Sequence, residues 1–249
     1  MAIVDIESAG AVRTVTLNRP EKRNALNGEM IARLLDAFSA RPKPEERVTV
    51  IRAAGPVFCA GLDLVDHDGI ATDPIEAMLR VIETYALPVV GLVQGDAIAG
   101  GNELALHCDI VVASAKARFG MSLAQIGLVP SWFLTKKLLE VAGPVTTRKI
   151  LLLGDPLSAE RLYELGIIAF VAPPEELEAS AKAVIDRLSA NAPLSLKTMK
   201  ATIVREMEFR DHLKHDDVDT MVANVLKSED GKEGMAARIA KRPAQFKGK

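Results

Sequence analysis

Segments with the residue pattern of a strand alternate with segments that have the pattern of a helix over the first two thirds of this 249-residue chain. From Pro174 onward the pattern is helical to about Ile239, with expected breaks near Pro193 and Gly231. This order predicts an α/β core followed by a helical C-terminal region. We place the core at residues 1–190 and the helical region at 191–249.

Periodicity and capping residues predict the individual elements. Asn27 is a candidate N-cap for a helix whose apolar residues recur at i, i+3, i+4 and i+7. Asp73-Pro74 opens another helix, because proline is favoured in the first turn, and Gly154 and Gly166 are expected to end helices. The expected strands are 2–8, 11–17, 48–53, 89–93, 110–113 and 167–171. The expected helices of the core are 28–40, one from residue 73, one from about residue 101, 131–142, 145–153 and a short one from residue 158.

The composition excludes several classes of protein. Hydrophobic residues make up 49% and charged residues 26%, a globular balance, and a net charge of −2 provides no basic surface for nucleic acid. No apolar run approaches the ~20 residues that a membrane span needs, and the N-terminus has no signal-peptide pattern. Two cysteines, Cys59 and Cys108, cannot form a disulfide framework, so we expect buried thiols in a cytoplasmic protein.

Two glycine-containing segments stand where strands should end. One is 58–64 (FCAGLDL), after the expected strand 48–53, and the other is 95–103 (GDAIAGGNE), after the strand 89–93. Turns of this kind free backbone N–H groups, and such groups near a helix N-terminus favour an oxygen that carries negative charge. Two converging N–H donors would form an oxyanion hole. Ordinary tight turns are the alternative.

Five ordered blocks of the sequence resemble the enoyl-CoA hydratase/isomerase (crotonase) family. The opening block is 17–26 (LNRPEKRNAL), and the two glycine segments, the second extended to Asp109, supply the next two. Residues 119–130 resemble the fourth block, and residues 158–167 the fifth, with a further match in the tail 228–246. The resemblance covers nearly the whole chain. It implies a spiral of ββα units with a helical C-terminal region that builds homotrimers, often stacked as hexamers.

The resemblance also assigns catalytic roles. The oxyanion donors would be the backbone N–H groups of Leu62 and Gly100, and Glu103 would be the first of the two glutamates that the family's hydratases use. Burial of Glu103 beside an apolar run would raise its pKa towards the range that is useful for proton transfer. A solvated glutamate at the start of a helix is the alternative.

The second family glutamate is absent, because Leu123 occupies its position. Leucine cannot exchange a proton, so the mechanism of water addition by two carboxylates is in doubt. A second departure is Trp132-Phe133, where the family has small residues near the acyl pocket. These rings either pack in the core or narrow the pocket and contact the substrate.

Other polar residues are weaker candidates for catalysis or metal binding. The segment Asp66-His67-Asp68 could supply an auxiliary base, although an exposed loop is the simpler interpretation. His107 and Cys108 are adjacent and have no further ligands near them in sequence, so we expect no metal site. Ser131 has no visible His–acid pair for a nucleophilic triad.

For coenzyme A, which would enter as the carrier part of the substrate and not as a separate cofactor, the resemblance indicates residues in three segments. They are Lys22, Arg23 and Ala25; Ala60, Asp63 and Leu64; and Phe246 in the tail. Leu123, Trp132 and Phe133 would border the acyl group. A frayed tail is the alternative for Phe246.

The expected function is therefore that of an acyl-CoA-processing lyase, with enoyl-CoA hydratase-like water addition that depends on one catalytic glutamate. Acyl-CoA hydrolysis, isomerisation and decarboxylation remain open, as does a catalytically degenerate member that only binds acyl-CoA. The sequence does not specify the acyl group or the pathway.

Overall fold

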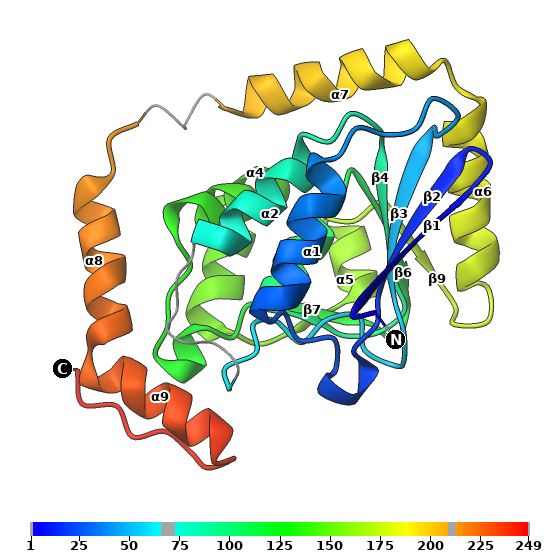
Figure 1. The fold of residues 1–249 in the computed structure, drawn as a ribbon. Helices are drawn as coiled ribbons and strands as arrows, with labels where there is room; N and C mark the ends of the chain where they lie inside the picture. The colour runs from blue at the N-terminus through cyan, green and yellow to red at the C-terminus, as the bar shows by residue number, and fades with distance from the viewer. Residues whose placement is uncertain (1, 66–72, 209–212, 249) are drawn as a thin grey trace.

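The computed structural model describes residues 2–65, 73–208 and 213–248, and its centre is a six-stranded sheet (Figure 1). The strand order is β1-β2-β3-β4-β6-β9. β1 runs antiparallel to β2, and the other neighbouring pairs of this sheet are parallel. The strands are β1 (Val4–Ala9), β2 (Val12–Leu17), β3 (Val48–Ala53), β4 (Val89–Val93), β6 (Ile110–Ser114) and β9 (Phe170–Ala172). The expectation of an α/β core is confirmed.

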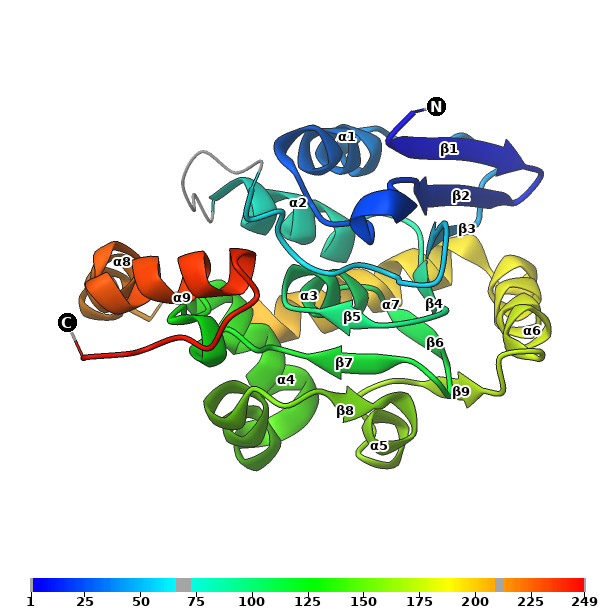
Figure 2. The ribbon, with the colours of Figure 1, turned by 90° about the horizontal axis from the view of Figure 1, so that it is seen from below.

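The central strands are buried on both faces because their apolar residues alternate between two layers. One layer packs against α6 (Leu177–Ala190), and the larger layer lies on the side of α1 (Gly28–Ser39), α2 (Asp73–Glu83) and α3 (Gly100–Leu106) (Figure 2). The strand residues on the α6 side are Val48, Val50, Val90, Leu92 and Val112. Those in the larger core include Ile51, Val89, Val93, Val111 and Ala113.

A second, three-stranded sheet extends the core beside α3. It consists of β5 (Ala97–Ile98), β7 (Arg118–Gly120) and β8 (Leu157–Ser158), with β5 and β7 parallel and β7 and β8 antiparallel. The sequence analysis missed all three strands, because two or three residues are too few for an alternating pattern to be recognised.

Side-chain caps start the helices that the sequence predicts. Asn27 accepts the N–H of Met30 at the start of α1, and Ser131 and Ser158 cap α4 (Trp132–Arg148) and α5 (Ala159–Glu164) in the same way. α4 bends at Gly143 (φ 64°), close to the expected division between two helices, and continues into a single π-helical segment (Lys149–Leu153). Gly154 and Gly166 have positive φ and follow helical segments, as predicted.

The C-terminal region is helical, as expected, and runs along the outside of the core. It contains α7 (Pro193–Met207), which crosses one end of the large sheet, and α8 (Asp216–Lys227) and α9 (Glu229–Ile239), which Figure 1 shows away from that sheet. The break expected near Gly231 lies earlier, at Ser228, whose hydroxyl accepts the N–H of Gly231 inside α9. The predicted strand 167–171 was misplaced as well, because only Phe170–Ala172 pairs with β6.

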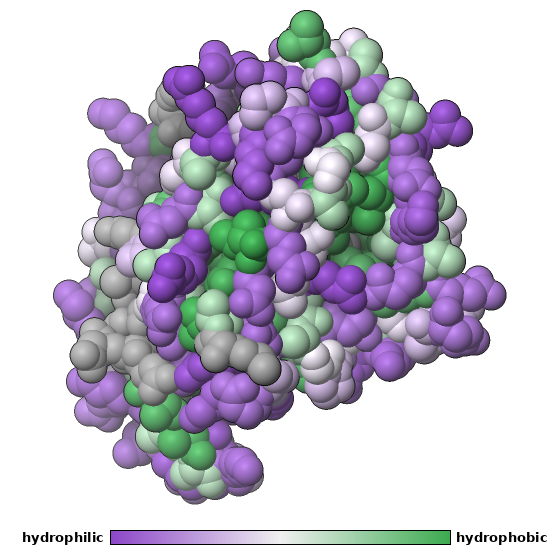
Figure 3. All heavy atoms as spheres, turned by 45° about the vertical axis from the view of Figure 1, so that its right-hand side comes forward, coloured by the Kyte–Doolittle hydropathy of each residue, from purple (hydrophilic) through white to green (hydrophobic). Residues whose placement is uncertain are grey.

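The surface and the cysteines fit the globular composition. On the face shown in Figure 3, apolar side chains come to the surface in separate patches among polar ones. Cys59 and Cys108 are buried and free. Within residues 2–65, 73–208 and 213–248, no helix has the length and apolar character needed to cross a membrane, and no group of three or more metal-ligating side chains gathers.

Candidate active site

The turn that contains Gly61 and the turn that precedes α3 contact each other at the N-terminus of α3. Cys59 and Ala97 form a parallel bridge, and the N–H of Ile98 donates to the carbonyl of Cys59 at 2.9 Å. A Cβ placed on Gly61 would lie 3.2 Å from the backbone nitrogen of Gly100. The glycine segments that the sequence singled out therefore meet backbone to backbone, which only residues without a side chain allow.

Adjacent glycines in this contact should respond differently to the addition of one methyl group. A Cβ on Gly101 would lie 2.2 Å from the carbonyl oxygen of Cys59, whereas a Cβ on Gly100 would meet the ends of the Ile75 and Leu26 side chains at 3.2 and 3.3 Å. Backbone cannot yield as side-chain ends do. We expect Gly101→Ala to lower the free energy of unfolding by about 3 kcal/mol or more, and Gly100→Ala by about 1 kcal/mol or less. Urea unfolding of both variants checks this, and equal losses would contradict the packing described.

The N–H groups of Leu62 and Gly100 have no acceptor among the described residues. Leu26 pairs with both neighbours of Leu62, because its N–H donates to the carbonyl of Gly61 and its carbonyl accepts the N–H of Asp63. The N–H of Leu62 thus points away from this bridge. Gly100 is the first residue of α3, where an N–H has no partner within the helix.

Ala99, not Gly100, carries the unusual backbone conformation at this turn. Its φ of 50° and ψ of −118° lie in a region that L-residues rarely adopt, while Gly100 has helical geometry. The Ala99 N–H donates to the carbonyl of Gly120 at 2.7 Å, which helps to fix the turn. Strain of this kind costs on the order of 1–3 kcal/mol and is common at functional sites. The sequence analysis did not single out Ala99.

Glu103 lies one turn further along α3 and is fully buried. Neither carboxylate oxygen has a hydrogen-bond partner among the described residues. Burial raises the pKa of Glu103 to about 8, and the ammonium of Lys137 opposes the shift without cancelling it. The predicted burial and the predicted rise in pKa are both confirmed. Such a group can accept or donate a proton near neutral pH.

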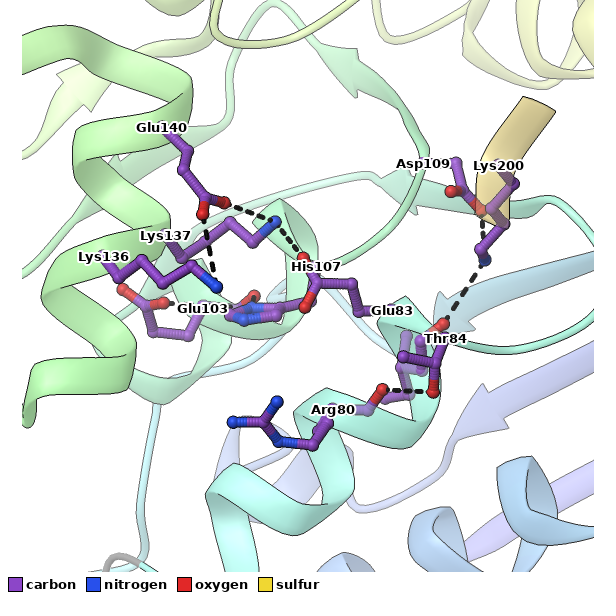
Figure 4. Close-up of polar contacts among 11 residues, drawn as sticks. Arg80, Glu83, Thr84, Glu103, His107, Asp109, Lys136, Lys137, Glu140 and Lys200 are labelled. Carbon is purple, nitrogen blue, oxygen red and sulfur yellow. Dashed lines mark hydrogen bonds and ion pairs between the residues drawn. The ribbon is translucent and has the colours of Figure 1, made fainter. Parts of the chain in front are cut away.

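His107 contacts both the carbonyl and the carboxylate of Glu103, and it is neutral. A carbonyl oxygen can only accept, so Nδ1–H of His107 donates to the Glu103 carbonyl at 2.8 Å, and the same nitrogen lies 3.9 Å from the Glu103 carboxylate. Burial lowers the pKa of His107 to about 4. Figure 4 shows both side chains facing α4, whose Lys137 pairs with Glu83 and Glu140. The cation nearest to Glu103 is therefore already engaged by two other carboxylates.

Stability should depend on pH through Glu103. Its folded-state pKa of about 8 lies above the ordinary 4.5. The contribution of Glu103 to the free energy of unfolding is therefore fully present below about pH 4.5 and is lost as the pH rises through 8. At about 1.4 kcal/mol per pKa unit, ionisation of Glu103 in the folded state costs a few kcal/mol. Glu103→Gln removes this cost, so the variant should gain stability over the wild type at pH 9 relative to pH 5. Denaturant unfolding at both pH values tests this, and a difference that does not change with pH would contradict it.

A buried network fixes the segment that carries Leu62. Arg19 Nη1 lies 2.5 Å from the carboxylate of Asp63, and the Val65 N–H donates to the same carboxylate at 3.1 Å. Asn24 donates to the carbonyls of Ala54 and Val57, each at 2.8 Å. The carboxylate of Asp63, which the resemblance placed at the substrate, is thus occupied by protein groups. The sequence analysis missed the role of Arg19.

The other residues expected at coenzyme A occupy two regions. Lys22 and Arg23 are exposed beside the Arg19 network, Ala25, Ala60 and Leu64 are half-buried there, and the Arg23 carbonyl accepts the N–H of Ala60 at 3.1 Å. Phe246 is exposed in the tail, where Asp230 accepts the N–H of Lys247 at 2.6 Å. Figures 1 and 2 show this tail beside α9, apart from the segment that joins β2 to α1. The chain thus brings the first set together and leaves Phe246 apart.

Leu123 and the two aromatic residues have different surroundings. Leu123 follows β7 by three residues, is half-buried and packs on the main core. Phe133 is buried and stacks on His107 with a centroid distance of 5.2 Å, while Trp132 stacks on His215 at 4.7 Å. The segment Asp66-His67-Asp68 lies outside the described residues.

The α/β fold and its site define a class of enzyme that can stabilise negative charge on a substrate oxygen and move a proton close to it. The enoyl-CoA hydratase/isomerase family model matches residues 7–249. The chain is 30% identical to a short-chain-enoyl-CoA hydratase of Clostridium acetobutylicum over 96% of this chain and 95% of that one. It is 33% identical to a 1,2-epoxyphenylacetyl-CoA isomerase of Escherichia coli, over 96% and 95% of the two chains.

Among solved structures, a methylmalonyl-CoA decarboxylase superposes with a TM-score of 0.91 at 28% identity, over 99% of this chain and 98% of that chain. The chain therefore belongs to the enoyl-CoA hydratase/isomerase family, within the crotonase superfamily, and is an enzyme of that family with the crotonase fold that the sequence predicted.

Proposed function

We propose that this enzyme adds water to, or removes it from, an enoyl-CoA thioester with one catalytic carboxylate. The observation that carries the proposal is that the Leu62 and Gly100 turns, both with N–H groups that have no acceptor among the described residues, meet at the N-terminus of the short helix that holds the buried Glu103. The relatives at about 30% identity include an enoyl-CoA hydratase, which supports the reaction class.

In the proposed reaction, the N–H groups of Leu62 and Gly100 donate to the thioester oxygen. Ionised Glu103 removes a proton from water while the water oxygen bonds to the β-carbon, and the π electrons move onto the thioester oxygen to give an enolate. Glu103 then returns the proton to the α-carbon, so that one water is added and Glu103 is regenerated. Stabilisation by one oxyanion donor is worth ~10²–10³ in rate.

Decarboxylation of a carboxylated acyl-CoA is the second candidate, because Leu123 stands where a second acid would be needed for two-carboxylate hydration. Loss of CO₂ leaves an enolate on the same two N–H groups, and that enolate needs a proton rather than a base. Glu103, with a pKa of about 8, holds a proton at neutral pH. The structural similarity to a methylmalonyl-CoA decarboxylase favours this candidate too.

The carrier, the assembly and the location belong to the same proposal. Lys22, Arg23 and Ala25, with the 60–64 segment, would hold coenzyme A as part of the substrate, and Phe246 would contribute from a neighbouring subunit of a homotrimer or hexamer. Phe246 is exposed on a tail whose backbone is hydrogen-bonded to Asp230 of α9, and this supports an intersubunit role. Two buried free thiols suit the cytoplasmic location that the sequence predicts.

A product screen separates the two candidates. Purified enzyme is incubated with but-2-enoyl-CoA and, separately, with malonyl- and methylmalonyl-CoA, and the products are identified by mass spectrometry. Formation of 3-hydroxybutyryl-CoA supports the hydratase, and loss of CO₂ from the carboxylated esters supports the decarboxylase. If no ester is converted, the proposal of an active enzyme at this site is wrong.

A further inference from the structure

A cavity of about 390 Å³ lies between α2, α4 and α8, next to the candidate active site but separated from Glu103. Its lining includes Arg80, Trp132, Phe133, His215 and Leu226. The volume is within the range of ligand pockets. The α2 wall adjoins the oxyanion turns, because Ile75, the residue before the lining residue Glu76, reaches within 3.2 Å of the position of a Cβ on Gly100.

Phe133 stands between this cavity and Glu103. It belongs to the lining of the cavity, and its ring also stacks on His107 at an interplanar angle of 24°. His107 in turn contacts Glu103. The described contacts therefore lead from Glu103 through His107 and Phe133 to the cavity.

The ring of Phe133 is held on more than one side. The guanidinium of Arg80 lies over it at 4.8 Å, a cation–π contact, in addition to the His107 stack. Figure 4 shows that Arg80 extends from α2 on the side of His107. Two stacking partners from different helices, with 8% exposure, give the ring little freedom to swing aside.

We propose that Phe133 sets the upper limit of acyl-chain length by closing the route from the reacting carbons to the cavity, so that the enzyme takes short acyl groups. This inference rests on the proposed binding of an acyl thioester at Leu62 and Gly100. The rest of the lining agrees with it, because Trp132, Val222 and Leu226 offer apolar contacts to an alkyl chain once the ring no longer blocks the way.

Binding of saturated acyl-CoA esters tests the inference without requiring turnover. Dissociation constants for butyryl-CoA and decanoyl-CoA are measured by calorimetry with wild type, Phe133→Ala, Phe133→Leu and Leu226→Ala. Leu226→Ala is the matched control, because it enlarges the same cavity from α8 without removing the ring that contacts His107. Phe133→Leu keeps more of the packing and covers the case in which Phe133→Ala does not fold.

In the wild type, decanoyl-CoA should bind no more tightly than butyryl-CoA. Each buried methylene strengthens binding by about fourfold, so the Phe133→Ala variant should favour decanoyl- over butyryl-CoA by at least about tenfold. Phe133→Leu should shift in the same direction by less, and Leu226→Ala should leave the ratio within about twofold.

Two results would overturn the inference. One is a wild type that already prefers decanoyl-CoA by about tenfold, and the other is an unchanged ratio in both Phe133 variants. The proposed function can fail independently of this inference. If the wild type and the variants show the expected ratios of dissociation constants but convert no ester, the inference about acyl-chain length holds and the proposed reaction is wrong.

Discussion

Glu103→Gln should lower kcat for hydration of but-2-enoyl-CoA by about 10³-fold and change KM by only a few-fold. Positioned acid–base groups contribute typically ~10²–10⁴ in rate, and this site has one such group where hydratases of the family use two. Glutamine has nearly the same shape as glutamate and is neutral, so it fits the fully buried site. Substrate binding through the backbone donors should therefore be retained. The loss of the enoyl absorbance under steady-state conditions measures both constants.

Glu140→Gln is the matched control for this variant. The side chain of Glu140 on α4 is 5% exposed, and its carboxylate lies 3.3 Å from Lys137, yet no proposed step uses it. Its kcat should stay within a few-fold of the wild type. Equal losses in the two variants would mean that the rate depends on the charge cluster and not on proton transfer by Glu103.

The rate of hydration should rise about tenfold per pH unit from pH 6 and level off above about pH 8. The base is ionised Glu103, and burial raises its pKa to about 8, so only about 1% of the enzyme is active at pH 6. Between pH 6 and pH 9 the gain in kcat/KM is therefore about 100-fold. Initial rates in buffers of constant ionic strength, with stability checked at each pH, provide the profile.

Decarboxylation should show the opposite profile. Protonated Glu103 supplies the proton to the enolate, so the rate should be flat below about pH 8 and should fall above it. The direction of the change thus identifies the reaction independently of the product screen. A rate that is constant from pH 6 to pH 9 for every substrate would show that Glu103 does not control it.

Local sequence patterns were sufficient for most of the core because its strands are regular and buried. The alternating contacts of β3 and β4 with two layers follow from strands rich in Val, Ile and Leu, and Asn27 marks the start of α1. The misplacement at Gly231 has a tertiary cause. A Cβ on Gly231 would lie 2.6 Å from the carbonyl oxygen of Val225, and one on Gly234 would lie 2.1 Å from that of Ile126, so the glycines in α9 serve close packing and do not end the helix.

The candidate site was only partly predictable for a similar reason. Leu62, Gly100 and Glu103 lie in motifs that can be found locally. Arg19 and Asp63 are 44 residues apart, and no periodicity links them. The contact of Phe133 with His107 and Arg80 likewise requires α2, α3 and α4 to be assembled. The sequence left open whether the aromatic pair packs in the core or narrows the acyl pocket, and the folded chain was needed to find which partners hold Phe133.

A crystal structure with bound butyryl-CoA tests the central claim most directly, because the claim concerns where one oxygen atom lies. The account predicts the thioester oxygen at about 2.7–3.1 Å from the backbone nitrogens of both Leu62 and Gly100, with the acyl carbons beside Glu103. A thioester oxygen beyond hydrogen-bond distance of either nitrogen, or an acyl group on a surface remote from Glu103, would contradict it.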